Sequence, residues 1–109
     1  MSSERRSGET EAAFRAVNER IEELAEEGAG ERRAIAILCE CSRATCVEKL
    51  ELSSPEYERI RADPELFFLR PGHDDPQVET VVERTAEYVV VRKTGVAARA
   101  ARAHDPRAD

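Results

Sequence analysis

The sequence predicts an α+β domain: a small antiparallel sheet with N-terminal, mid-chain and C-terminal helices, held together by a zinc site at the tip of a hairpin. Two observations support this fold class. Apolar residues recur at three- and four-residue steps near the N-terminus, whereas later segments are short, apolar or alternating, as strands are. All three cysteines of the 109-residue chain also lie within eight consecutive residues. We expect residues 1–9 to be disordered, residues 10–104 to form a single metal-binding domain and residues 105–109 to form a tail.

Size and composition limit the core and the class of protein. With 109 residues, 40% of them hydrophobic and none of them tryptophan, the chain has room for one domain with a modest core. Such small cores are often helped by a metal, a disulfide or a partner. No apolar run approaches the roughly 20 residues of a membrane span, and the N-terminus lacks the apolar segment of a signal peptide. We therefore expect a cytoplasmic protein without membrane contact, in which cysteines stay reduced.

The charge distribution disfavours binding to nucleic acid. The chain has a net charge of −6, with −4 in residues 1–30, −5 in residues 31–91 and +3 in residues 92–109. An acidic chain repels the phosphate backbone, unless its basic C-terminal segment acts alone. The cations that would then bind are Arg92, Lys93, Arg99 and Arg102. Alternatively, this segment lies near the acidic N-terminal segment of the same molecule.

The first helix is expected to begin after Thr10, whose hydroxyl suits an N-cap, and to end at Gly28-Ala29-Gly30. It carries one narrow apolar stripe, formed by Phe14, Val17, Ile21 and Leu24. A narrow stripe can pack on a sheet or against the identical helix of a partner. For a chain of this size, we expect packing on the sheet.

The next two segments predict a hairpin that carries the cysteines at its tip. Residues 34–41 are mostly apolar and indicate a buried strand, and residues 47–52 alternate as a returning strand does. Residues 42–45 form the turn between them.

The remaining elements follow from capping and turn signals. They are a helix over residues 55–62, a strand over residues 66–69, an antiparallel hairpin over residues 78–84 and 87–93, and a helix over residues 96–103. The mid-chain helix starts at Ser53-Ser54-Pro55-Glu56, where serine caps, proline suits the first turn and glutamate completes a capping box. The segment 78–84 could instead form a short helix.

Cys39, Cys41, Cys46 and His73 form the candidate ligand set, with the spacing C-x-C-x4-C…H. Structural zinc is bound tetrahedrally by cysteine sulfur and histidine nitrogen. Alternation along a strand places the first two cysteines on one face, with Glu40 pointing away. The C-x-C spacing is tighter than the usual C-x2–4-C spacing. We expect these four side chains to bind one Zn²⁺.

Other interpretations of this cluster stay open. His104 is an alternative fourth ligand, and Asp74 or Asp75 could ligate the metal or hydrogen-bond His73. The thiols could also be ordinary small buried residues. In a third interpretation, the first two cysteines form a redox pair that the third resolves.

The sequence contains no recognisable catalytic arrangement. A closed four-ligand zinc site leaves no position for the water that catalytic zinc needs. The chain has no Gly-rich phosphate loop and no H-E-x-x-H motif, and nothing selects a nucleophilic pair of Cys46 and His73. We therefore expect a non-enzymatic regulatory module that acts through contacts with an unidentified protein. The alternatives are a thiol redox or metal sensor and a nucleic-acid-binding regulator.

Five segments suggest a relationship to other proteins. They are Cys39-Glu-Cys41-x4-Cys46, Glu56–Pro64, Phe68-x-x-Pro71-Gly72-His73, Tyr88–Val91 and Asp105–Arg107. Together they resemble short uncharacterised proteins of GC-rich actinobacteria, over about residues 14–107. Arginine outnumbers lysine fifteen to two, which also favours a GC-rich bacterial source. The resemblance implies that the cysteine and histidine positions belong to one module, and it implies no activity.

Overall fold

The computed structural model describes residues 2–29, 34–41, 43, 46–105 and 107, and over these residues it shows three helices and two antiparallel sheets. The helices are α1 (Ser2–Ala29), α2 (Ser54–Arg61) and α3 (Gly95–Ala103). The strands are β1 (Ala34–Leu38), β2 (Lys49–Ser53), β3 (Leu66–Leu69), β4 (Glu79–Arg84) and β5 (Val89–Lys93). The predicted α+β class, with its three helices, is confirmed.

The strands form two sheets, whereas the sequence predicts one. β1 and β2 make a two-stranded antiparallel hairpin, and β3, β5 and β4 make a three-stranded antiparallel sheet in that order. The segment 79–84 is a strand, so the alternative of a short helix there is wrong. Both sheets contribute to one apolar cluster, so they meet through side chains and not through strand pairing. Its members are Ile35, Ile37, Leu50, Leu52, Tyr57, Ile60, Phe68, Tyr88 and Val90.

Helix α2 starts at the predicted signal. The Ser53 hydroxyl accepts a hydrogen bond from the backbone N–H of Glu56, and the Glu56 carboxylate accepts one from the backbone N–H of Ser53. This reciprocal capping box satisfies two backbone donors that the helix itself cannot pair. The cap places α2 directly after β2, where Tyr57 and Ile60 enter the shared core.

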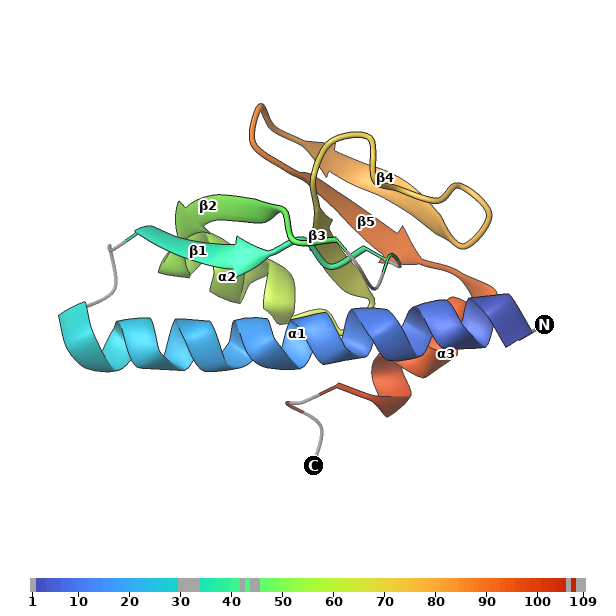
Figure 1. The fold of residues 1–109 in the computed structure, drawn as a ribbon, viewed down its shortest axis with the longest axis horizontal. Helices are drawn as coiled ribbons and strands as arrows, with labels where there is room; N and C mark the ends of the chain where they lie inside the picture. The colour runs from blue at the N-terminus through green and yellow to red at the C-terminus, as the bar shows by residue number, and fades with distance from the viewer. Residues whose placement is uncertain (1, 30–33, 42, 44–45, 106, 108–109) are drawn as a thin grey trace.

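Helix α1 runs along one side of both sheets, and α3 lies beside its N-terminal half (Figure 1). It begins at Ser2, well before Thr10, so the predicted N-cap at Thr10 is wrong. Once a helix has nucleated, each added residue gains a hydrogen bond at little cost, so polar residues can extend it. In the part of the chain that the structure describes, no helix is long and apolar enough to cross a membrane.

The face that α1 turns toward the domain is polar. The buried side chains recur at four- and three-residue steps and are Glu11, Arg15, Asn18 and Glu22. The predicted apolar stripe lies largely outside: Val17 is 47% exposed and Leu24 is 51% exposed. Only Ile21 from this stripe packs against the shared core. The expectation that the stripe packs on a sheet is therefore wrong for most of its length.

Buried charges on this face have partners from distant elements. The Lys93 ammonium lies 2.6 Å from the Glu11 carboxylate and also contacts Glu79. The Arg15 guanidinium stacks 4.0 Å from the centre of the Phe67 ring and donates a hydrogen bond of 3.2 Å to the carbonyl of Ala101. Because a buried charge without a partner is costly, these contacts fix how α1 sits on the domain.

We predict that Glu11→Gln removes part of the pH dependence of stability. Burial raises the pKa of Glu11 from 4.5 to about 7, and the attraction of Lys93 offsets this only in part. The folded state then holds the proton more tightly than the unfolded state, so the free energy of unfolding falls as the pH rises from about 4.5 to about 7. In the variant this fall should shrink by roughly 1–3 kcal/mol, measured by urea unfolding at several pH values.

The matched control is Glu23→Gln, which removes an exposed carboxylate from the same helix. It should leave the pH profile of the wild type unchanged. If the Glu11→Gln profile also coincides with that of the wild type, the carboxyl of Glu11 is not the group that titrates.

Candidate metal centre

The cysteines lie at the tip of the β1–β2 hairpin, as predicted. β1 ends at Leu38, earlier than the predicted strand end, and the backbone N–H of Cys39 still bonds the carbonyl of Glu48 across the hairpin at 2.9 Å. The backbone N–H of Cys46 bonds the carbonyl of Arg43 at 3.0 Å, which turns the chain back. The rest of the predicted turn, residues 42 and 44–45, lies outside the described residues.

His73 reaches the same place from the loop after β3. The backbone N–H of His73 bonds the carbonyl of Arg70 at 3.0 Å, with Pro71 and Gly72 between them. Gly72 has a φ of 91°, which a type II turn requires at its third residue and which glycine adopts without strain. The Pro-Gly pair therefore sets the direction in which the imidazole is presented.

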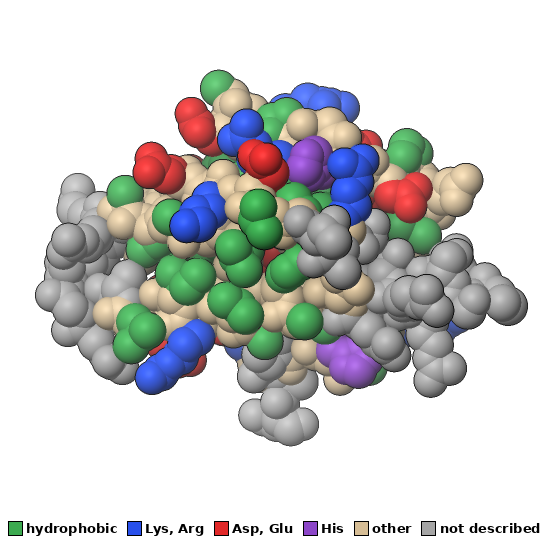
Figure 2. All heavy atoms as spheres, viewed as in Figure 1, with side chains coloured by type: hydrophobic (Ala, Val, Ile, Leu, Met, Phe, Trp, Pro, Cys, Tyr) green, Lys and Arg blue, Asp and Glu red, His purple; other side chains and the backbone are tan. Residues whose placement is uncertain are grey.

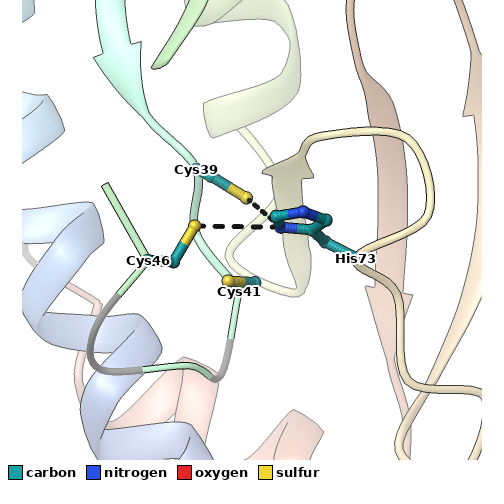
Figure 3. A group of neighbouring side chains, drawn as sticks. All are labelled: Cys39, Cys41, Cys46 and His73. Carbon is teal, nitrogen blue, oxygen red and sulfur yellow. Dashed lines mark hydrogen bonds between the residues drawn. The ribbon is translucent and has the colours of Figure 1, made fainter. Parts of the chain in front are cut away.

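The four predicted side chains come together (Figure 3). The potential ligand atoms of Cys39, Cys41, Cys46 and His73 all lie within 4.8 Å of one another. The Nδ1 atom of His73 is 3.5 Å from the sulfur of Cys39 and 3.8 Å from that of Cys46. Zn–S bonds of about 2.3 Å and Zn–N bonds of about 2.0 Å at tetrahedral angles separate such atoms by about 3.6 Å. The group is thus positioned to bind a metal ion and fits zinc.

Backbone donors and burial act in opposite directions on the thiols. Burial raises the pKa of the Cys39 thiol, and the backbone N–H of Arg70, 3.2 Å from this sulfur, partly offsets the rise. Burial likewise raises the pKa of the Cys41 thiol, and a hydrogen bond from the backbone N–H of Arg43 partly offsets this rise. Thiols in this setting favour the protonated form until a cation balances their charge, and metal binding would then release the protons.

Glu40 points away from the two cysteines beside it, as predicted, and enters the interior. It is fully buried, and its carboxylate accepts hydrogen bonds from the Asn18 amide and from the backbone N–H of Phe68. Sequence reasoning did not identify Asn18 as a neighbour of this site. The available signal was the polar spacing on α1, where Asn18 falls in register with Arg15 and Glu22.

The alternative fourth ligands do not join the group. Among the described residues, the cluster of ligand atoms that fits one ion includes His73 and neither His104, Asp74 nor Asp75. His104 is exposed at the end of α3. The carboxylate of Asp75 instead accepts a hydrogen bond from the backbone N–H of Gln77 in its own loop.

Three of the four basic residues proposed for nucleic-acid binding contact acidic side chains, and the fourth, Arg99, is exposed. Lys93 is buried between Glu11 and Glu79. The other ion pairs join Arg92 to Asp63 and Glu65, and Arg102 to Glu65. Arg107, near the C-terminus, pairs with Glu19 of α1 and Glu58 of α2. Carboxylates of the same molecule thus offset much of the basic C-terminal charge.

Comparison with protein families, curated proteins and solved structures finds no match to this chain. The resemblance to short actinobacterial proteins therefore stays a prediction. The chemistry of the site follows from its own geometry: three thiols and one imidazole, brought from two loops, are placed to bind a metal ion.

We predict that His73→Ala weakens zinc binding at least about tenfold, because water must replace the fourth ligand. His104→Ala removes the other histidine, which lies outside the cluster, and serves as the matched control. Competition with a chromogenic chelator measures both affinities. Equal losses in the two variants would assign the fourth position to another group.

Proposed function

We propose that this chain is a non-enzymatic, regulatory module that binds one structural Zn²⁺ and acts through contact with another protein chain. The main support for zinc binding is that four potential ligand atoms from two separate loops lie within 4.8 Å of one another. Soft thiolates with one imidazole in a tetrahedral arrangement favour zinc over the oxygen-seeking cations.

A structural role for the metal is supported by where the site lies. The cysteines belong to the loop of the β1–β2 hairpin, and His73 belongs to the loop after β3 of the other sheet. One ion would therefore connect two sheets that share no strand pairing. Four protein ligands also fill a tetrahedral zinc, which leaves no position for catalysis by bound water.

The competing functions have weaker support. A redox sensor needs an accessible thiol with a lowered pKa, whereas burial raises the pKa of Cys39 and Cys41. Nucleic-acid binding needs several unpaired cations close together, whereas Lys93 is buried and Arg92 and Arg102 pair with acidic side chains. Of the four proposed cations, this leaves the exposed Arg99.

We predict about one zinc per chain in protein purified without chelator, measured by elemental analysis. Cys41→Ser should lose both the metal and cooperative thermal unfolding, because binding energy at such sites is folding energy. Chelator added to the wild type serves as the control and should reproduce the melting curve of the variant. Metal-free wild-type protein with the same melting curve as metal-loaded protein would exclude a structural zinc.

The outward face of α1 offers a surface for contact with another protein chain. Val17 and Leu24 are about half exposed, and with Phe14 and Ile21 they follow a 3-4-3 spacing. Figure 2 shows hydrophobic side chains gathered along the side on which α1 lies. This spacing is that of the apolar seam in a helix pair. We propose that the stripe pairs with the same stripe of a second copy, since the domain's own core leaves Val17 and Leu24 about half exposed.

A preformed helix makes such pairing cheaper than in an isolated peptide. Short helices are marginal alone because nucleation is costly, but α1 is already ordered by its buried polar contacts. Fully burying an exposed valine or leucine side chain contributes about 1.5–3 kcal/mol. Val17 and Leu24 are already about half buried, so covering the rest of each contributes roughly half as much, and a symmetric pair covers each of them twice.

We predict that the wild type dimerises and that Val17→Glu/Leu24→Glu weakens the dimer at least 100-fold, as measured by sedimentation equilibrium. Two charges placed in an apolar seam oppose burial, so the change should be large. Val82→Glu is the matched control, because Val82 is 51% exposed on β4 and lies outside the stripe. A wild type that stays monomeric at its highest soluble concentration would reject this contact.

A further inference from the structure

We infer that Asn18 is a positioning residue for the metal ligands, and that it couples the docking of α1 to metal occupancy. The inference rests on the proposed zinc site and goes beyond it, because Asn18 touches no ligand atom of the cluster. It follows from a chain of buried hydrogen bonds that leads from α1 to both loops of the site.

The first link joins α1 to the loop that carries Cys39 and Cys41. The amide nitrogen of Asn18 donates to the carbonyl of Leu38 at 2.9 Å and to the carboxylate of Glu40 at 2.8 Å. The amide oxygen of Asn18 accepts from the backbone N–H of Leu38 at 2.7 Å. One fully buried side chain therefore fixes the residues on both sides of Cys39.

The second link joins the same loop to the segment that leads to His73. The backbone N–H of Glu40 donates to the carbonyl of Phe68 at 2.8 Å, and the Glu40 carboxylate accepts from the Phe68 N–H at 3.0 Å. Two residues further on, the backbone N–H of Arg70 donates to the sulfur of Cys39. The turn that presents His73 begins at Arg70, so the histidine side of the site is held through Glu40 as well.

Only an amide side chain satisfies these partners. Leu38 offers one backbone donor and one backbone acceptor, and Asn18 pairs with both at once. Aspartate would keep an acceptor but lose the donor, and it would place a second carboxylate against Glu40. Alanine would leave buried polar groups without a partner, and the loop would then have to move to satisfy them.

The coupling has to act in both directions. If docked α1 favours the ligand geometry, bound metal favours docked α1 by the same factor. Hydrogen bonds made directly to metal ligands, such as that of the Arg70 N–H to the Cys39 sulfur, typically change metal affinity 10- to 100-fold, and Asn18 acts on the backbone that holds them. The outward stripe with Val17 and Leu24 also belongs to α1, so metal occupancy would change the stability of the docked helix that carries this stripe.

The test measures zinc affinity by chelator competition in Asn18→Ala and Asn18→Asp. We expect both variants to bind zinc at least tenfold more weakly than the wild type. Tyr57→Phe is the matched control, because the Tyr57 hydroxyl donates to Glu19 of α1 at 2.6 Å, and its loss removes a contact of α1 that does not reach the metal loops. This control should lose stability and keep its zinc affinity within about twofold.

Hydrogen exchange of the wild type adds a measurement that needs no variant. Zinc should slow amide exchange over residues 11–22 of α1, and Asn18→Ala should abolish that effect. Unchanged zinc affinity in Asn18→Ala, or an equal loss in Tyr57→Phe, would overturn the inference, as would exchange in α1 that does not respond to zinc. A wild type that binds no zinc would instead refute the proposed metal site itself.

Discussion

The arrangement of this domain depends on satisfying the polar groups that are buried beneath α1. Arg15, Asn18 and Glu40 are fully buried, and each needs a partner that water cannot supply. Hydrogen bonds and charge pairs are directional, so they accept far fewer docked positions of α1 than an apolar face would. If one partner is lost, a buried polar group is left without a hydrogen bond. A small number of directional contacts therefore fixes the position of α1.

The candidate metal site lies between these buried polar groups and a second apolar cluster, which is formed by Cys39, Cys41, Phe67, Leu69, Val89, Val91 and Ala101. Cys39 and Cys41 pack with Phe67 and Leu69 on one side, while Glu40 between them turns toward α1. Because side chains alternate in direction along an extended chain, consecutive residues here contact different parts of the domain. The cysteines face the histidine loop, and the glutamate fixes the backbone that carries them. A bound ion would add a cross-link at a point where neither sheet pairs with the other.

The C-terminal segment neutralises charge within the molecule. Arg107 forms paired contacts with Glu19 and Glu58, and buried Arg61 contacts Glu19 and Asp105. Exposed ion pairs contribute little, about 0–1 kcal/mol each. Arg61 is different, because removing either acidic partner would leave a buried guanidinium underpaired. The end of the chain is thereby tied to both α1 and α2.

Local signals in the sequence were sufficient for the elements that depend on near neighbours. The capping box at Ser53 and Glu56, the strands and the ligand set with His73 all follow from spacing and residue type, because their partners are close in sequence or their chemistry is distinctive. The division into two sheets and the buried face of α1 were decided only by the tertiary structure. Asn18 bonds Leu38 and Glu40, which lie 20 and 22 positions further along the chain, and periodicity cannot show that a polar stripe has such partners. The spacing of apolar residues indicates which residues can be buried. Which face of α1 is buried depends on the polar partners that the rest of the fold offers.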